Sequence, residues 1–127
     1  MAKRQSIHIE GFKHVNPIPN AARVGNTLMS GLIVGMDPAA GKVAPTLDEQ
    51  LGFIFVHMKA IVEAGGGTMD DVVKVNVYLK DLKNRSAVNN QWLKAFPDEH
   101  TRPARHAHYA PMDGASEVQA DFIAIID

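Results

Sequence analysis

The chain has 127 residues, of which 46% are hydrophobic and 21% charged, a composition typical of one globular domain rather than of a disordered or fibrous chain. Its 13 basic and 14 acidic side chains give a formal charge of -1, which provides no basic surface for nucleic acid or for an anionic membrane. The lack of cysteine excludes disulfides, thiolate nucleophiles and cysteine-based metal sites. With no long apolar run and no signal-peptide core, we expect a cytoplasmic protein with a single domain over residues 1–127.

Short strands are predicted in the N-terminal third of the chain. Residues 6–12 alternate polar and apolar side chains, and the prolines that follow end this pattern. Gly25 and Asn26 favour a tight hairpin turn between residues 22–24 and residues 27–34. We therefore expect the hairpin to supply the second and third strands of a sheet.

A glycine interrupts the second arm of this hairpin at Ser30-Gly31. Glycine inside a strand marks either a bulge or a place where a ligand or another backbone comes close, because no Cβ stands in the way. Both interpretations stay open from the residues alone. The next segment, residues 36–43, is rich in turn-forming residues and predicts a loop.

A long helix is predicted to start after Thr46 and to end at the run of glycines from Gly65. Thr46 and Glu49 form a capping box, in which a hydroxyl and a carboxylate satisfy the first free amides of a helix. The apolar stripe that should pack on the sheet consists of Leu47, Leu51, Ile54, Phe55, Met58, Ile61 and Val62. His57 lies off this stripe, so we expect it at the surface or at an edge.

The second half of the chain predicts the remaining strands and one more helix. Residues 68–71 could start a short helical turn, and residues 72–79 form the clearest central strand. A helix over residues 84–96 follows, with Asn89 at the margin of its apolar stripe. The stretch 101–111 and residues 117–126 predict the last two strands. In the central strand one face is expected to carry Val73, Val75, Val77 and Leu79.

This order predicts an α+β fold, with two helices on one face of a mixed sheet of about six strands. No helix remains to cover the other face of the sheet. We expect that face to be apolar and too large for a comfortable monomer, so the sequence favours a homo-oligomer.

The strand predicted in the stretch 101–111 carries the residues of greatest chemical interest. Period-2 alternation puts Arg105, Ala107 and Tyr109 on one face and His106 and His108 on the other. A guanidinium matches a carboxylate with a planar fork of donors, so Arg105 suits recognition of a small organic acid. An exposed arginine in a weak surface ion pair is the alternative that the local sequence leaves open.

Four stretches, placed on these elements, resemble one known family. They are VGNTLMSG at residues 24–31, AGGGTMDDVVKVNVYLKDL at 64–82, VNNQWLKAF at 88–96 and RPAR at 102–105. In order and spacing they are similar to the motifs of the reactive intermediate deaminases, also called the RidA or YjgF-like family. The resemblance covers residues 17–125.

The resemblance implies a chorismate-mutase-like fold assembled as a homotrimer, with a cleft between neighbouring subunits. It implies hydrolysis of reactive enamines and imines, such as 2-aminoacrylate, to a keto acid and ammonia, with neither cofactor nor metal. By this resemblance Arg105 grips the substrate carboxylate, Gly31 with Ser30 forms a backbone wall of the cleft, and Asn89 matches the family's helix asparagine.

The chain departs from the family pattern at three positions. Ile18 stands where the family has a tyrosine in the early loop, and Ala107 where it has a cysteine. Gln119 aligns with the glutamate that is thought to activate water, and an amide cannot act as a base. Asp121, or Glu117, lies on the same strand face by period 2 and could replace it.

Three functional interpretations follow. The first is an enamine or imine deaminase whose substrate is a 2-aminoacrylate-like or larger imino acid, since Ala107 leaves space beside Arg105. The second is a carboxylate-binding or regulatory trimer without catalysis, which Gln119 and Ile18 favour. RNA cleavage has also been attached to the family, and the near-neutral charge argues against it.

Two further residue types on this strand could take part in chemistry. The His106 and His108 pair has the spacing of a metal chelate, but no cysteine or carboxylate has ligand spacing with it, so we expect histidines packed at a subunit contact. Tyr109 could supply the missing phenol, although a buried structural tyrosine is the interpretation that the sequence favours.

Overall fold

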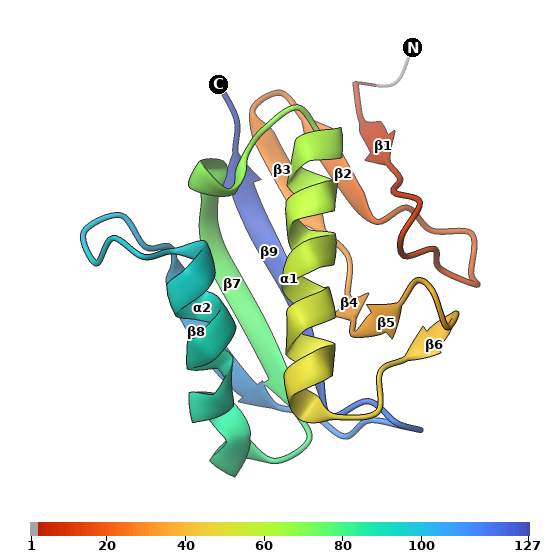
Figure 1. Cartoon of the computed structure of the whole chain (residues 1–127). Helices are drawn as coiled ribbons and strands as arrows, with labels where there is room; N and C mark the ends of the chain where they lie inside the picture. Colours follow the sequence, from red (N-terminus) through yellow and green to blue (C-terminus); the bar gives the residue numbers. More distant parts are fainter. Residues whose placement is uncertain (1–2) are drawn as a thin grey trace.

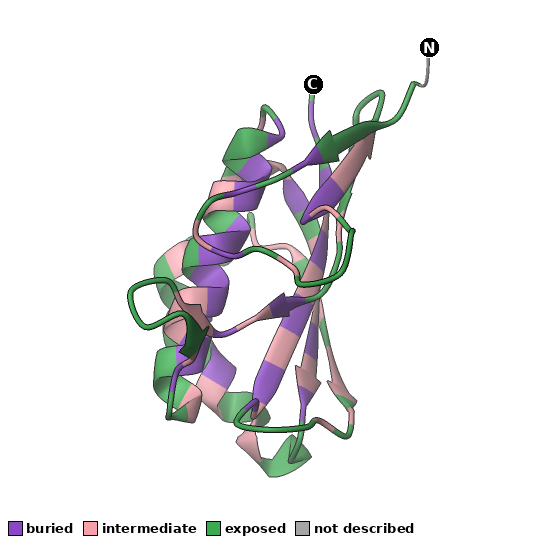
Figure 2. Cartoon of the chain, turned by 90° about the vertical axis from the view of Figure 1, so that its right-hand side faces the viewer, coloured by how far each residue is buried: buried purple, intermediate pink, exposed green. Residues whose placement is uncertain are grey.

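The computed structural model describes residues 3–127, so the first two residues of the expected domain lie outside the described part. Two helices lie side by side on one face of a twisted sheet (Figure 1), and the buried residues lie between the two layers (Figure 2). The α+β class with both helices on one face is confirmed. Within residues 3–127 no helix combines the length and the apolarity that a membrane crossing needs.

The main sheet has seven strands, and six of them form a row in the order β1-β2-β3-β9-β7-β8. β7 and β8 are parallel, the other pairs are antiparallel, and β4 pairs with β9 beyond the end of β3. The strands are β1 (Gln5–Ile7), β2 (Ala21–Val24), β3 (Thr27–Ser30), β4 (Ile33–Val34), β5 (Met36–Asp37), β6 (Lys42–Val43), β7 (Val72–Leu79), β8 (Ala104–Tyr109) and β9 (Val118–Ile125). The helices are α1 (Leu47–Ala64) and α2 (Asn89–Ala95), with 3-10 turns η1 (Met69–Asp71) and η2 (Leu82–Val88).

Local sequence signals explain the strongest elements. Gly25 has a φ of 57°, which suits the hairpin turn that joins β2 to β3. Thr46 caps α1, because its hydroxyl oxygen accepts the amide hydrogen of Glu49 at 3.3 Å. The predicted capping box forms only in part, since the Glu49 carboxylate accepts from the Thr46 hydroxyl at 2.8 Å instead of from the Thr46 backbone amide. Gly65 ends α1 where a Cβ would collide with the end of the Leu28 side chain of β3, so a larger residue there would force Leu28 to move.

The prediction for His57 is wrong, since its side chain is only 1% exposed. Residues 36–43, expected to be a loop, form the small hairpin β5-β6, which lies beside α1 and covers the flank of the helix that carries His57. The imidazole Nε2 lies 2.7 Å from the Met36 carbonyl oxygen and therefore donates to it. Burial lowers the pKa of His57 below its usual value, although the Met36 hydrogen bond opposes this shift.

The central strand departs from strict alternation at its start. A bulge shifts the register between β7 and β9 at Val72 and Lys74, so Val72 is buried and Val73 is 46% exposed. Val73 therefore does not belong to the core face, contrary to the prediction. The expected helix over residues 84–96 is likewise divided, into η2 and the shorter α2.

The open face of the sheet, which no helix covers, divides into two parts. Its apolar half contains Val24, Met29, Ile123 and Ile125 of β2, β3 and β9. Its polar half contains Asn76, Tyr78, His106, His108, Gln119 and Asp121 of β7, β8 and β9. The expectation of a uniformly apolar open face is therefore wrong, because β7 and β9 carry polar residues at alternate positions over half of it.

Candidate functional site

Arg105 lies on the helix-facing side of β8, in register with Val75 of β7. Its guanidinium reaches α2, where Nη2 donates to the side-chain oxygen of Asn89 at 2.9 Å. The guanidinium carbon Cζ lies 4.9 Å from the ring centroid of Trp92, a cation–π contact. Two residues of α2 therefore hold the arginine that the sequence singled out.

The segment that leads into β8 is fixed by a second arginine. Arg102 donates from Nε to the Phe96 carbonyl oxygen at 2.8 Å and from Nη2 to the Pro97 carbonyl oxygen at 3.2 Å. These bonds close the turn between the end of α2 and β8. As a result the backbone of Arg105 and the helix that supports its side chain keep a fixed relative position.

The charge of Arg105 is only partly satisfied. Its Nη1 atom is buried and has no hydrogen-bond partner within residues 3–127. In the same part of the chain no carboxylate lies within ion-pairing distance of Arg105, so the surface ion pair that the sequence left open is absent. Burial lowers the pKa of the Arg105 guanidinium from its usual value. A buried donor without an acceptor costs about 1–3 kcal/mol, which an incoming anion could recover.

Ala107 and Tyr109 share the face of Arg105, as period 2 predicted, but differ in their surroundings. Ala107 is half-buried against the core and pairs with Val77. Tyr109 is 65% exposed at the end of β8, so the expectation of a buried structural tyrosine is wrong within one chain. The strand ends there, and no element of the described part of the same chain covers its phenol.

Ser30 and Gly31 lie at the end of β3, where that strand separates from β9. The Ser30 hydroxyl accepts the amide hydrogen of Phe122 at 2.9 Å and donates to the Gly31 carbonyl oxygen at 2.8 Å. The Gly31 amide donates to the Asn20 carbonyl oxygen at 2.8 Å. A Cβ on Gly31 would lie 3.7 Å from that oxygen, an ordinary contact, so packing within one chain does not require glycine here.

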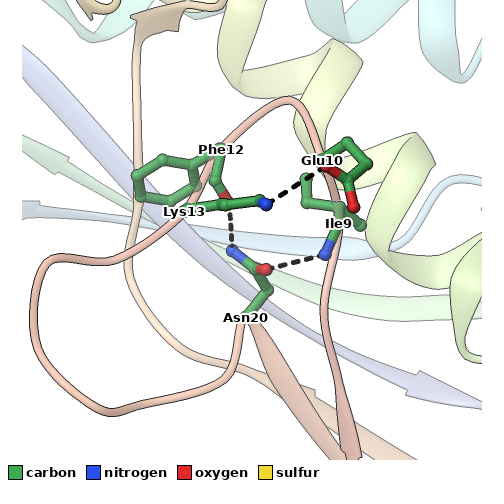
Figure 3. A network of polar contacts seen from close by, with 5 residues as sticks. All are labelled: Ile9, Glu10, Phe12, Lys13 and Asn20. Atoms are coloured by element: carbon green, nitrogen blue, oxygen red, sulfur yellow. Dashed lines mark hydrogen bonds and ion pairs between the residues drawn. The ribbon is translucent and has the colours of Figure 1, made fainter.

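The early loop is attached to the same place through Asn20, which is only 3% exposed. Its side-chain oxygen accepts the Ile9 amide hydrogen at 2.9 Å, and its side-chain nitrogen donates to the Phe12 carbonyl oxygen at 2.8 Å (Figure 3). These bonds shape residues 8–20, part of which was predicted to be strand, and leave Ile18 at 49% exposure. Sequence reasoning missed Asn20, because a single asparagine after a proline carries no periodic signal.

Gln119 and Asp121 lie on the open face, opposite to the side of Arg105. Asp121 accepts hydrogen bonds from Asn76 at 2.9 Å and from the Tyr78 hydroxyl at 2.8 Å. Burial, together with the Asp121 hydrogen bond and its negative charge, raises the pKa of Tyr78 to about 12. Both side-chain oxygens of Asp121 therefore already accept a hydrogen bond from a neighbouring side chain of β7.

The two histidines of β8 extend this polar half of the open face. The Nε2 atom of His108 lies 3.1 Å from the side-chain oxygen of Asn76. The His108 ring stacks on the Tyr78 ring, with ring centroids 5.0 Å apart. The His106 and His108 centroids are 3.9 Å apart. No three histidine, aspartate or glutamate side chains of residues 3–127 gather closely enough to bind a metal ion.

One chain brings Arg105 and Asn89 together but keeps the Ser30–Gly31 segment and Gln119 away from them. Ser30 and Arg105 lie at the same level of the sheet, since Phe122 contacts Ser30 and pairs with Val75, which in turn pairs with Arg105. β9 and β7 stand between β3 and β8, so the two positions are about 14 Å apart at about 4.8 Å per strand. Gln119 lies between them on the opposite face.

Comparison with known proteins shows to which family the chain belongs. A family model described as Endoribonuclease L-PSP matches residues 10–121. A protein of Salmonella typhimurium named 2-iminobutanoate/2-iminopropanoate deaminase is 32% identical over 111 residues, which cover 84% of this chain and 86% of that protein. The chain belongs to the RidA family.

Further relatives span nearly the whole chain. A RutC family protein of Pyrococcus abyssi is 33% identical to it over 124 residues, or 94% of this chain and 96% of the relative. The crystal structure of RidA from an Antarctic Psychrobacter superposes with a TM-score of 0.87 at 31% identity, covering 96% of this chain and 99% of that one. The fold of this RidA-family chain is therefore that of its solved relatives.

Proposed function

We propose that the protein hydrolyses a reactive imino acid or its enamine tautomer to a keto acid and ammonia, in a cleft formed between two copies of the chain. The observation that carries this proposal is the state of Arg105, a half-buried guanidinium with one nitrogen lacking an acceptor and with no acidic partner among residues 3–127. The names of relatives such as the Salmonella iminobutanoate deaminase supply the class of reaction.

Asn89 adds a second donor for the substrate carboxylate. Its side-chain oxygen accepts from Arg105, because a guanidinium nitrogen can only donate. The amide nitrogen of Asn89 is then free to donate to a ligand. A carboxylate beside Arg105 would receive one charge-assisted hydrogen bond from the guanidinium and one bond from Asn89, a geometry that also fixes the orientation of the acid.

Contribution of a second copy follows from the separation of the motifs. Ser30 lies about 14 Å across the sheet from Arg105 of the same chain, at about 4.8 Å per strand. This separation is too large for both residues to contact one small substrate. Gly31, Ile18 and Tyr109 are exposed and lie at surfaces that a neighbouring copy could cover. A closed trimer, in which β8 of one copy meets the β3 end of the next, satisfies these requirements.

The proposed chemistry requires little from the protein. Water adds to the carbon of the C=N bond, the nitrogen takes up a proton, and ammonia leaves as the keto acid forms. Starting from the enamine, a proton is first added to the terminal carbon. Arg105 would hold the carboxylate in place. Gln119 of the same chain lies on the opposite face of the sheet, so it could take part only from a neighbouring copy. There it could hold the water by a hydrogen bond but could not remove its proton, so orientation supplies most of the rate.

The second candidate is a carboxylate-binding trimer that does not turn over its ligand. Two observations favour it: Gln119 replaces the expected base, and Asp121 is engaged by Asn76 and Tyr78. The formal charge of -1 disfavours RNA cleavage, the activity named in the family model's description, because RNA binding depends on basic side chains that contact phosphates.

An imine-release assay tests the proposal. An amino-acid oxidase generates 2-iminobutanoate or 2-iminopropanoate, and the rate of ammonia release above the spontaneous rate is measured with wild type, Arg105→Met and Gln119→Glu. We expect a wild-type acceleration that Arg105→Met removes, while the exposed-arginine control Arg85→Met keeps it. Binding of the keto acid without acceleration, with activity gained in Gln119→Glu, would favour the second candidate.

A further inference from the structure

Trp92 is the aromatic surface on which Arg105 rests, and it is the only tryptophan of the chain. The Arg105 Cζ atom lies 4.9 Å from the Trp92 ring centroid. Trp92 stands three residues after Asn89 on α2, so both side chains project from one face of the helix. A single turn of α2 therefore presents two different contacts to the same guanidinium.

These two contacts restrain different motions. The hydrogen bond from Nη2 to Asn89 fixes one corner of the guanidinium, but the plane could still turn about that bond. An aromatic face under Cζ fixes the plane, because the cation is attracted to the ring quadrupole. With both contacts, Nη1 and its edge of the guanidinium keep one direction in space. This matters since arginine has a long side chain and β8 is an edge strand.

We propose that Trp92 is a positioning residue that orients Arg105 for the carboxylate of the ligand. The proposal rests on the proposed function in so far as Arg105 is the carboxylate anchor, but it does not require turnover. Trp92 itself has no role in the chemical step. It holds the plane of the guanidinium before the ligand arrives, so the free energy of ordering that side chain is not lost on binding.

Trp92 also belongs to the core, and the test must separate the two roles. The residue is 8% exposed and packs edge-on against Phe96 with ring centroids 4.8 Å apart. Any smaller side chain will reduce stability through this packing. Only a role through Arg105 predicts that an aromatic replacement restores function and that the effect of Trp92 disappears when the guanidinium is absent.

A double-mutant cycle provides this separation. Trp92→Leu, Trp92→Phe and Arg105→Met are combined, and the dissociation constant of 2-oxobutanoate is measured by calorimetry, with imine hydrolysis followed in parallel. We expect Trp92→Leu to weaken binding by about three- to thirtyfold, the range of a partly desolvated cation–π contact, and to raise KM more than it lowers kcat. Trp92→Phe should recover most of the loss, and Trp92→Leu should have no further effect in the Arg105→Met background.

Intrinsic fluorescence gives a second readout that does not depend on a variant's stability. Because Trp92 is the only tryptophan and contacts Arg105, titration of the wild-type protein with 2-oxobutanoate should change its emission, and Arg105→Met should abolish the change. Equal loss in Trp92→Leu and Trp92→Phe, an undiminished effect of Trp92→Leu in the Arg105→Met background, or binding without a change in emission would each overturn the proposal. Binding with these signatures but without hydrolysis would overturn only the deaminase function.

Discussion

Replacing Asn89 by aspartate exchanges a single amide group for a carboxylate at the place where Arg105 is held. The Asn89 side-chain oxygen already accepts from Arg105 at 2.9 Å, so an aspartate oxygen can occupy the same position and keep that bond. The substitution removes the free amide donor and adds a negative charge beside the proposed carboxylate position. The guanidinium then has an acidic partner within its own chain.

The two consequences have opposite signs. A partly exposed ion pair between the introduced carboxylate and Arg105 should change the free energy of unfolding by about 0–1 kcal/mol in the stabilising direction. Ligand binding loses one hydrogen bond to a charged group, about 1.5–3 kcal/mol, and meets a like charge. Since about 1.4 kcal/mol corresponds to a tenfold change in the dissociation constant, we expect Asn89→Asp to weaken 2-oxobutanoate binding about 10- to 150-fold.

Calorimetric titration together with urea unfolding tests both parts. Asn90→Asp is the matched control, because it adds the same charge at the next exposed position of α2, where no contact with Arg105 is made. The control should leave the dissociation constant within about twofold, as expected of a surface change away from the site. Unchanged affinity in Asn89→Asp, or a loss of equal size in Asn90→Asp, would refute the assignment of Asn89 and Arg105 to one carboxylate site.

Three other variants test the local physical chemistry. Asn20→Ala should lower the free energy of unfolding by about 2–4 kcal/mol in urea titrations, because the Ile9 amide and the Phe12 carbonyl group both lose their buried partner. The control Asn16→Ala, at an exposed position of the same loop, should change the free energy of unfolding by less than about 0.5 kcal/mol. Asp121→Asn should lower the pKa of Tyr78 from about 12 towards its usual value, which can be followed through the NMR chemical shifts of the Tyr78 ring carbons. An unchanged pKa would mean that burial alone raises the pKa of Tyr78. Burial lowers the pKa of His57, so its contribution to the free energy of unfolding is present above pH 6.5 and is lost as the pH falls. The free energy of unfolding should therefore fall less steeply below pH 6.5 in His57→Gln than in the wild type. Equal slopes of this free energy against pH in the two proteins would contradict this.

The elements with strong local signals were predictable from the sequence. The turn glycine Gly25, the Thr46 cap and the alternation of β9 each depend on a few neighbouring residues. The fold class followed from their order. By contrast, the burial of His57 depends on the β5-β6 hairpin, whose two short strands are held by pairing with each other and by contact with α1. No periodicity within α1 could reveal that cover.

The candidate site was predictable only in part, for a similar reason. Alternation correctly assigned Arg105 and the two histidines to opposite faces of β8. It could not show that Trp92 lies under the guanidinium, because this contact joins a helix and an edge strand whose relative position depends on the whole core. The bulge at Val73 and the two-part open face are also consequences of pairing between strands distant in sequence.

A crystal structure of the protein with 2-oxobutanoate bound would show whether Arg105 anchors the ligand between two copies of the chain. We expect the ligand carboxylate to accept hydrogen bonds from the Arg105 guanidinium and from the Asn89 amide nitrogen, with Ser30 and Gly31 of a neighbouring copy on the other side of the ligand. A carboxylate bound without contact to Arg105, or a complete site within one copy of the chain, would contradict it.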